Sequence, residues 1–247
     1  MTDKATSQTL SAQLILALAA MLLAVYAEYS GLDLWLAHQF YDPVHQQWPL
    51  RSLFITKTLL HDDAQSMVKV LSLLMAVLMA GSFIIGRLRP YRKPLSYLFV
   101  ASVTGPLIVS LLKNVTHIQI PWQLAEFGGN MPYIRLFDPV QNGLPIGHAF
   151  PGGHSSGGFA FFSLYFLCYH YAPRYRLYGF MLPLITGLVF AMDQEVRGAH
   201  FISHDLMSLA ICWSSAWFWS RVYLRQQPER DQQPGIESLP VRWNNDR

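Results

Sequence analysis

Long apolar runs separated by polar links make up most of the chain. A helix needs about 20 mostly apolar residues to cross the hydrocarbon core of a bilayer, and six runs reach or approach that length. The fourth and the sixth are long enough only if their helices begin earlier, near His154 and Phe201. The pattern therefore predicts an all-α fold, a polytopic helical membrane bundle of about six transmembrane helices. The six runs are 10–29, 67–85, 95–112, 159–171, 177–192 and 206–219.

Basic residues follow the second, fourth and sixth runs and give the bundle a direction. Segments on the cytoplasmic side of a membrane carry an excess of lysine and arginine. We therefore expect these segments, and the N and C termini with them, to be cytoplasmic, while the three other links face outward. The basic residues are Arg87, Arg89, Arg92, Lys93, Arg174, Arg176, Arg221 and Arg225.

Composition agrees with the membrane class and divides the chain in two. Apolar residues make up 52% and charged residues 13% of the sequence, against roughly 25% charged in an ordinary soluble domain. A net charge of +3 does not imply a nucleic-acid partner. The first run exceeds the about 7 to 15 apolar residues of a signal-peptide core, so we expect it to be retained. We predict an integral membrane domain over 1–225 and a polar, disordered cytoplasmic tail over 226–247.

Ionisable residues gather at the outward ends of the apolar runs. Lys113 ends the third run, His154 opens the fourth, and the segment EVRGAHFISHD, 195–205, joins the fifth to the sixth. Each has a simple interpretation alone, since a lysine can extend to the membrane surface and a histidine can cap a helix. A charge near hydrocarbon is costly, however, and usually has a function or a partner. Three such places on one side of the membrane therefore predict a functional site there.

The residue types at these places suit a phosphate. The segment PGGHSSGG, 151–158, lets an anion approach the main chain of Gly152 and Gly153, with Ser155 as a further donor. Lysine supplies a point charge, arginine a forked donor, and a helix N-terminus its free N–H groups. Paired imidazoles can then act as nucleophile and acid. The pattern favours phosphoryl transfer.

These residues resemble a known family. Lys113 followed by Ile120-Pro121, then PGGH at 151–154, then the segment around His200 look like the three signature motifs of the type 2 phosphatidic acid phosphatase (PAP2) family. Its superfamily includes vanadium haloperoxidases and bacterial acid phosphatases. The resemblance covers 113–208 and implies that His200 is the nucleophile and forms a phosphohistidine. It further implies His154 as general acid, Lys113, Gly152 and Gly153 around the phosphate, and no metal or other cofactor.

Three positions depart from the family pattern. The family usually has arginine at the positions of Ile120 and Gln194, and aspartate at the position of His204. Arg197 or Arg135 can replace the missing arginines as phosphate donors, and Gln194 itself is a further candidate. Either His204 or Asp205 can orient the ring of His200, as a carboxylate does in a catalytic triad. The sequence leaves both choices open.

The resulting prediction is an integral membrane phosphatase of a bacterial inner membrane, with its site facing the periplasm. It hydrolyses a phosphomonoester or diphosphate on a lipid headgroup, so its partners are a lipid phosphate and membrane lipids. Undecaprenyl diphosphate, phosphatidylglycerol phosphate, phosphatidic acid and lipid A species all fit. A lipid phosphotransferase fits the same mechanism, and the sequence gives no oligomeric state.

Two alternatives belong to other classes. His200 and His204 are spaced like the histidines of a zinc-binding helix, and His148, His154 and Asp205 can complete a ligand shell. The glutamate that serves such sites as general base is missing between them. A transporter or scaffold is the other alternative. Transporters place polar groups near the bilayer midplane on broken helices, whereas here these groups lie at one rim.

Overall fold

The computed structural model describes residues 2–224, and these form helices and loops without a β-strand. The predicted tail, 226–247, lies outside the described residues. The long helices are α1 (Thr2–Tyr29), α3 (Ala64–Ile84), α4 (Arg92–Lys113), α7 (Arg176–Val196) and α8 (Ile202–Tyr223). Shorter ones are α2 (Leu32–His38), α5 (Gly153–Phe159), α6 (Ser163–Tyr171), a π-helix η1 (Ile55–Asp63) and the 3-10 turns η2 (Gly86–Tyr91), η3 (Pro121–Gln123), η4 (Ala125–Phe127), η5 (Ala160–Phe162) and η6 (Pro173–Tyr175).

All six predicted runs are helical. The fourth does begin near His154, because α5, η5 and α6 follow one another from 153 to 171 without a break. Within residues 2–224, four segments are long and apolar enough to cross a membrane, rather than six. The continuous helical segment α5–η5–α6 and helix α8 are not apolar enough to be among these segments. Glycine and serine are frequent in α5–η5–α6, and the first turn of α8 contains charged and polar residues. The four segments are Ala12–Tyr29, Gln65–Ile84, Gly86–Lys113 and Pro173–Val196.

The outer surface of the bundle is apolar, as an integral membrane protein requires. Leu22 of α1, Leu73 of α3 and Leu177 of α7 are 70%, 65% and 63% exposed. Apolar patches of this extent are not stable in water, whereas hydrocarbon solvates them. The protein is therefore an integral membrane protein.

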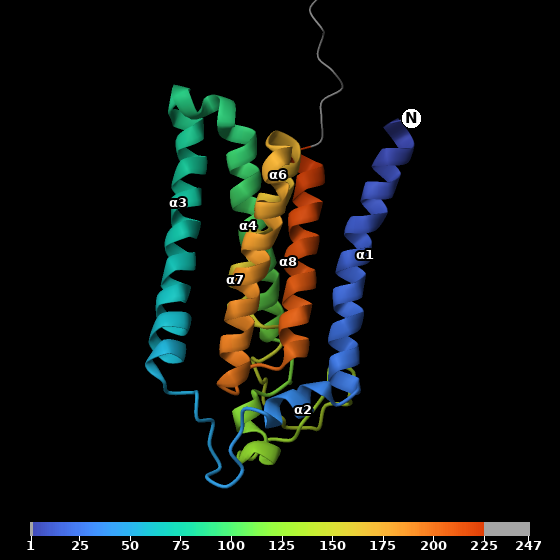
Figure 1. The fold of residues 1–247 in the computed structure, drawn as a ribbon, viewed down its shortest axis with the longest axis vertical. Coiled ribbons are helices and arrows are strands. Elements are labelled where there is room, and N and C mark those ends of the chain that lie inside the picture. Colours follow the sequence, from blue (N-terminus) through green and yellow to red (C-terminus); the bar gives the residue numbers. More distant parts are fainter. Residues whose placement is uncertain (1, 225–247) are drawn as a thin grey trace, which may run out of the picture.

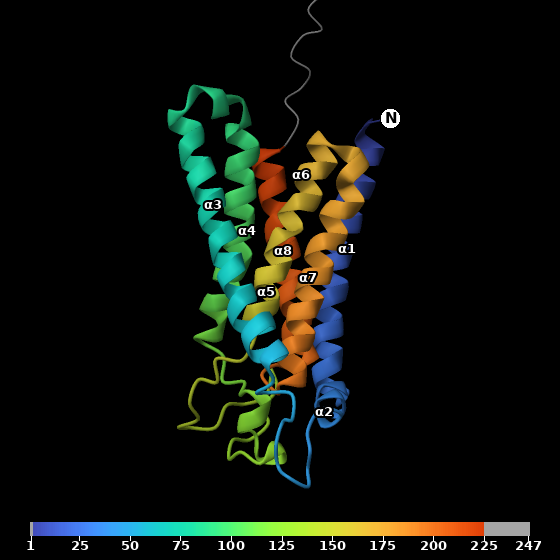
Figure 2. The same cartoon turned by 60° about the vertical axis from the view of Figure 1, so that its left-hand side comes forward.

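Helix α8 lies at the centre of the bundle, packed against α1 and α4, while α5 and α6 pack against α7 and α3 lies outermost beside α4 (Figures 1 and 2). Small buried residues of α8 allow this close packing, and Cys212 lies directly against Gly105 of α4, where an added Cβ would be 2.9 Å from its Sγ. Phe162, Phe166 and Trp213 fill the core around it. The position of α8 is therefore fixed by packing along its length.

The two ends of the bundle differ. The described chain begins and ends at one end, where only η2 and η6 connect helices, and α2 and the long links lie at the other (Figure 1). The three links predicted to share a side therefore do so. There an aromatic cluster of Tyr41, Trp48, Phe127 and Phe201 packs the links together. Gly198 lies under the Trp48 ring with φ +72°, so both space and backbone require glycine.

Candidate active site

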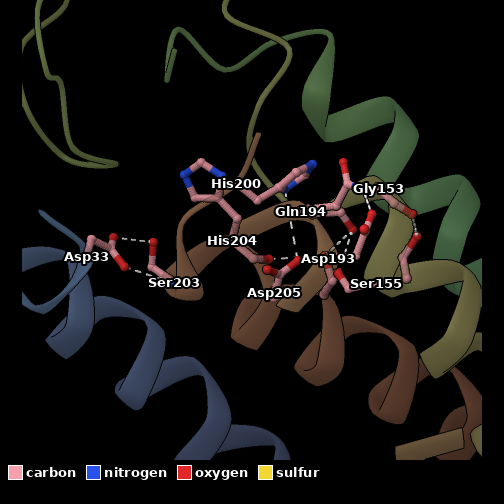
Figure 3. A network of polar contacts seen from close by, with 12 residues as sticks. Asp33, Gly153, Ser155, Asp193, Gln194, His200, Ser203, His204 and Asp205 are labelled. Carbon is pink, nitrogen blue, oxygen red and sulfur yellow. Dashed lines mark hydrogen bonds and ion pairs between the residues drawn. The ribbon is translucent and has the colours of Figure 1, made fainter. Parts of the chain in front are cut away.

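The predicted residues from three distant segments meet at this end. Lys113 comes from the last turn of α4, and His154 from the first turn of α5. His200 lies in the link between α7 and α8, and Asp205 in the first turn of α8. Figure 3 shows the link, the first turn of α8 and the start of α5 side by side. The packing of α8 against α4 and α5 produces this meeting.

The two imidazoles form the centre of the site. The ring centroids of His154 and His200 are 6.5 Å apart, with the ring planes at 79°. His200 is 6% exposed, and His154 is half-buried. This separation leaves room for one tetrahedral group between a nucleophile on one ring and a proton donor on the other.

The environments of His204 and Asp205 differ in a way that bears on the orientation of His200. The Asp205 carboxylate is buried, and its Oδ1 lies 3.9 Å from Nδ1 of His200. The His204 ring packs edge-on against Phe150 and Phe201, with centroids 5.4 Å away in each case, and its centroid lies 5.6 Å from that of His200. Asp205 therefore places a carboxylate oxygen on the Nδ1 side of His200, whereas His204 contacts that residue through its ring.

Gly152 joins α5 to α8 through its main chain. Its N–H donates to the carbonyl of His204 at 2.9 Å, and its carbonyl accepts from Ser208 Oγ at 2.7 Å. A Cβ at this position would collide with the carboxylate of Asp205, so only glycine fits. Because the N–H of Gly152 is already bonded, an anion at the start of α5 would meet the N–H groups from Gly153 onward.

The charge of Lys113 lies beside the start of α5. A Cβ added to Gly153 would be 3.1 Å from Nζ of Lys113. The ammonium also interacts with the charge of Asp205, and Ser155 is fully buried with its hydroxyl donating to the carbonyl of Gly152 at 3.2 Å. A cation therefore lies next to His154 at the N-terminus of α5.

Arg197 and Gln194 are buried at the end of α7, and both contact Asp193, which the sequence did not single out. Nη1 of Arg197 lies 3.5 Å from Oδ2 of Asp193, and Nε2 of Gln194 donates to the same oxygen at 2.6 Å. An arginine four residues after an aspartate on one helix is a pattern that could have revealed this pair. The charge of Arg197 is therefore partly compensated within α7.

Arg135 has other contacts. Its Nε and Nη2 donate to Asp138 at 2.9 and 3.1 Å, which holds the pKa of that carboxyl below its usual range. Its guanidinium also lies over the ring of Tyr29, 4.5 Å from the centroid. The Nε and Nη2 edge of its guanidinium is therefore already paired with a carboxylate. Ile120, the other departure from the family, packs against an apolar cluster that includes Phe150.

Asp33 is an acid that sequence reasoning missed, whereas Glu195 opens the segment 195–205 that the sequence singled out. Both are buried, and both line a small pocket beside His200. Asp33 accepts hydrogen bonds from Ser203, which is 170 residues away in the sequence. No local pattern signals such a contact.

The metal-binding alternative has no ligand set in the part of the chain that the structure describes. No group of three or more histidine, cysteine, aspartate or glutamate side chains among those residues is arranged to hold an ion. His148, which that alternative needs, is exposed on a loop with φ +53°.

A helical membrane bundle with paired imidazoles, a lysine and the N-terminus of α5 at one end has the makeup of a phosphoryl-transfer protein. A sequence model of the PAP2 superfamily matches residues 94–228, which is more than half of the chain and includes Lys113, His154 and His200. The protein therefore belongs to the PAP2 superfamily, as the motifs predicted. Its members are generally phosphatases and act on phosphate-bearing substrates. No curated protein and no solved structure matches the chain.

Proposed function

We propose that the protein is a lipid phosphate phosphatase of a bacterial inner membrane, with its site at the periplasmic face. It removes phosphate from a monoester or diphosphate headgroup through a phosphohistidine. The observation that carries this proposal is the pair His154 and His200, with ring centroids 6.5 Å apart beside Lys113 at one end of an apolar bundle.

Substrate binding uses the positive groups at the start of α5. The Lys113 ammonium and the N–H groups of Gly153 and His154 hold the phosphate oxygens, because charge-assisted bonds and a helix N-terminus both favour an anion. Arg197 is the remaining nearby arginine, and its pairing with Asp193 limits the charge it offers. Arg135 is the weaker candidate, since Asp138 already pairs with the Nε and Nη2 edge of its guanidinium.

The first chemical step forms the covalent intermediate. Nε2 of His200 attacks phosphorus, and the bond from phosphorus to the leaving oxygen breaks. Protonated His154 gives its proton to that oxygen, so the lipid leaves as an alcohol or a monophosphate. Asp205 faces Nδ1 of His200 and stabilises the charge that develops on the ring.

The second step restores the enzyme. Neutral His154 takes a proton from water, the water oxygen attacks phosphorus, and the bond to His200 breaks to release inorganic phosphate. A lipid hydroxyl in place of water would make the same site a phosphotransferase.

The membrane position supports a lipid as substrate. An apolar cavity of about 320 Å³ opens between α3, α4 and α7 and reaches Gly158 and Phe161, about one turn of α5 beyond His154. A hydrocarbon chain can remain there while the headgroup enters the polar site. We also propose that the chain crosses the membrane six times and that both of its termini are cytoplasmic. This topology is supported by the basic residues near η2 and η6, at the end of the bundle away from the site.

Phosphate release by the purified full-length protein tests the function. We expect release in EDTA from at least one of undecaprenyl diphosphate, phosphatidylglycerol phosphate, phosphatidic acid and a lipid A species, with inhibition by vanadate. His200→Ala and His154→Ala should each lower kcat by at least about 10³-fold, because nucleophile and acid act as a unit.

Other outcomes would contradict the proposal. Normal turnover by His200→Ala would remove the nucleophile. Activity lost in EDTA and restored by zinc would favour a metallohydrolase. Turnover of none of these lipids would favour a transporter or scaffold.

A further inference from the structure

Asp33 makes a buried contact between two helices that the chemistry does not use. It lies on α2, outside the bundle, and is 1% exposed. Its Oδ1 accepts from the backbone N–H of Ser203 at 3.0 Å and its Oδ2 from the Ser203 hydroxyl at 2.5 Å. Figure 3 shows this pair next to His200 and His204. Both donors belong to one residue in the first turn of α8.

The start of α8 lacks a cap of its own. Its N-cap residue, Phe201, has no polar side chain and makes no capping hydrogen bond. The first N–H groups of a helix have no partner within the helix, and a carboxylate is the group that the helix dipole favours there. Asp33 therefore performs for α8, from another helix, what an N-cap aspartate performs within one.

The turn that Asp33 caps carries the site. Asp205 is two residues after Ser203, and His200 three residues before it. We propose that Asp33 is a positioning residue, which caps α8 from α2 and so fixes Asp205 against His200. This role rests on the proposed function. Asp33 and His200 also line the same small pocket, so the capping contact lies directly behind the nucleophile.

The presence of an ionisable carboxyl group at Asp33 is not explained by a contribution to the stability of the fold. Burial raises the pKa of Asp33 to about 6, and the two bonds from Ser203 only partly oppose this. A raised carboxyl pKa means that the fold disfavours the ionised form present at neutral pH. Sites that lose stability in this way are typically functional ones, which agrees with a positioning role.

The same helix offers a matched control. His38 of α2 contacts Glu126 of η4 at 2.8 Å, and both side chains are exposed. This pair connects α2 to the outward links without touching α8. Ala37 packs in the aromatic cluster, so α2 keeps an apolar anchor when Asp33 is changed. Glu126→Gln therefore alters a polar contact of α2 but not the cap.

Hydrogen exchange tests the cap without any assay of activity. In the purified full-length protein, Asp33→Ala should speed exchange of the amide of Ser203 by about tenfold or more, because its acceptor is removed. Asp33→Asn keeps one acceptor oxygen and should fall between Asp33→Ala and the wild type. Glu126→Gln should exchange at the wild-type rate. Wild-type exchange in Asp33→Ala would overturn the cap.

Steady-state kinetics tests the positioning. Asp33→Ala should lower kcat about 10- to 100-fold with KM within about twofold, since small misplacement of a reacting group costs rate rather than binding. The double change Asp33→Ala with Ser203→Ala should be no slower than Asp33→Ala alone, because both remove one contact. Assays are run well below the melting temperature of each variant, so that loss of folded protein does not enter kcat.

The outcomes separate the two proposals. An unchanged kcat in folded Asp33→Ala, or a loss that falls on KM alone, would overturn the positioning role. If Asp33→Ala does not fold, Ser203→Ala carries the test, and we expect about a threefold to tenfold loss of kcat from it. A wild-type protein that hydrolyses no phosphate lipid, with exchange at Ser203 still accelerated in Asp33→Ala, would overturn the proposed function while supporting the cap.

Discussion

At the scale of single residues, the site depends on Gly152, where only glycine fits. Gly152 accepts from Ser208 and donates to the His204 carbonyl, and it has no space for a Cβ beside Asp205. This contact brings the start of α5, with His154, against the start of α8. The sequence motif was interpreted as a loop through which an anion approaches the backbone. The structure adds that its first glycine is the point where two helices touch.

Replacing the two candidate orienting residues separately tests which of them serves His200. Asp205→Asn should lower kcat by about 10² to 10⁴, because the amide can no longer stabilise a charged His200 ring in its correct tautomer. For His204→Gln we expect a loss of kcat at least tenfold smaller than that for Asp205→Asn, since the His204 ring contacts Phe150 and Phe201. The larger loss in His204→Gln would reverse the assignment.

At the scale of elements, the short helix α2 supplies a hydrogen-bond acceptor to the first turn of the long helix α8. Packing along α8 fixes its axis, but its first turn needs partners for free N–H groups, and Asp33 supplies one. The contact has an electrostatic cost, because the pKa of Asp33 is raised to about 6 by burial. The cost appears only when the carboxyl is ionised.

The pH dependence of stability follows from the direction in which burial shifts the pKa of Asp33. The folded state holds the proton of Asp33 up to about pH 6, and the unfolded state only to about 3.8. The contribution of Asp33 to the free energy of unfolding is therefore complete below about pH 4 and is lost as pH rises through 6. Relative to Asp33→Asn, the wild type should lose about 2 kcal/mol between pH 4 and 7.

Thermal unfolding in detergent at several pH values measures this difference. Asp42→Asn is the control, since Asp42 is exposed and hydrogen bonds from His45 lower its pKa. A wild type that gains stability over Asp33→Asn as pH rises would contradict the expected sign.

At the scale of the whole molecule, the polar site and the basic links occupy opposite ends of an apolar bundle. The described chain ends at Leu224, at the end away from the site. The residues that follow belong to the polar tail predicted over 226–247. Catalysis should therefore be independent of that tail.

Truncation after Arg225 tests this expectation. The shortened protein should keep kcat and KM within about twofold of the full-length values, because none of the proposed catalytic groups lies beyond Asp205. His200→Ala in the same shortened background should be inactive, which excludes a contaminating phosphatase. A large fall in kcat on truncation would place a functional contact in the tail.

Local sequence patterns determined the helices and the chemical class. Apolar runs specify membrane-length helices because hydrophobicity is summed over neighbouring residues, and all six runs are helical. Lys113, the PGGH segment and His200 predicted the PAP2 superfamily, and the family match over 94–228 confirms it. Spacing along the chain carried this information, so no tertiary contact was needed.

Only the tertiary structure decided which side chains meet. It paired Asp33 with Ser203 across 170 residues, directed Arg135 to Asp138, and set Asp205 rather than His204 opposite Nδ1 of His200. Such pairings depend on helix rotation and on loop paths, which are fixed by packing of the whole bundle. A sequence pattern gives residue types and spacing, whereas the direction of a side chain between two helices is a property of both together.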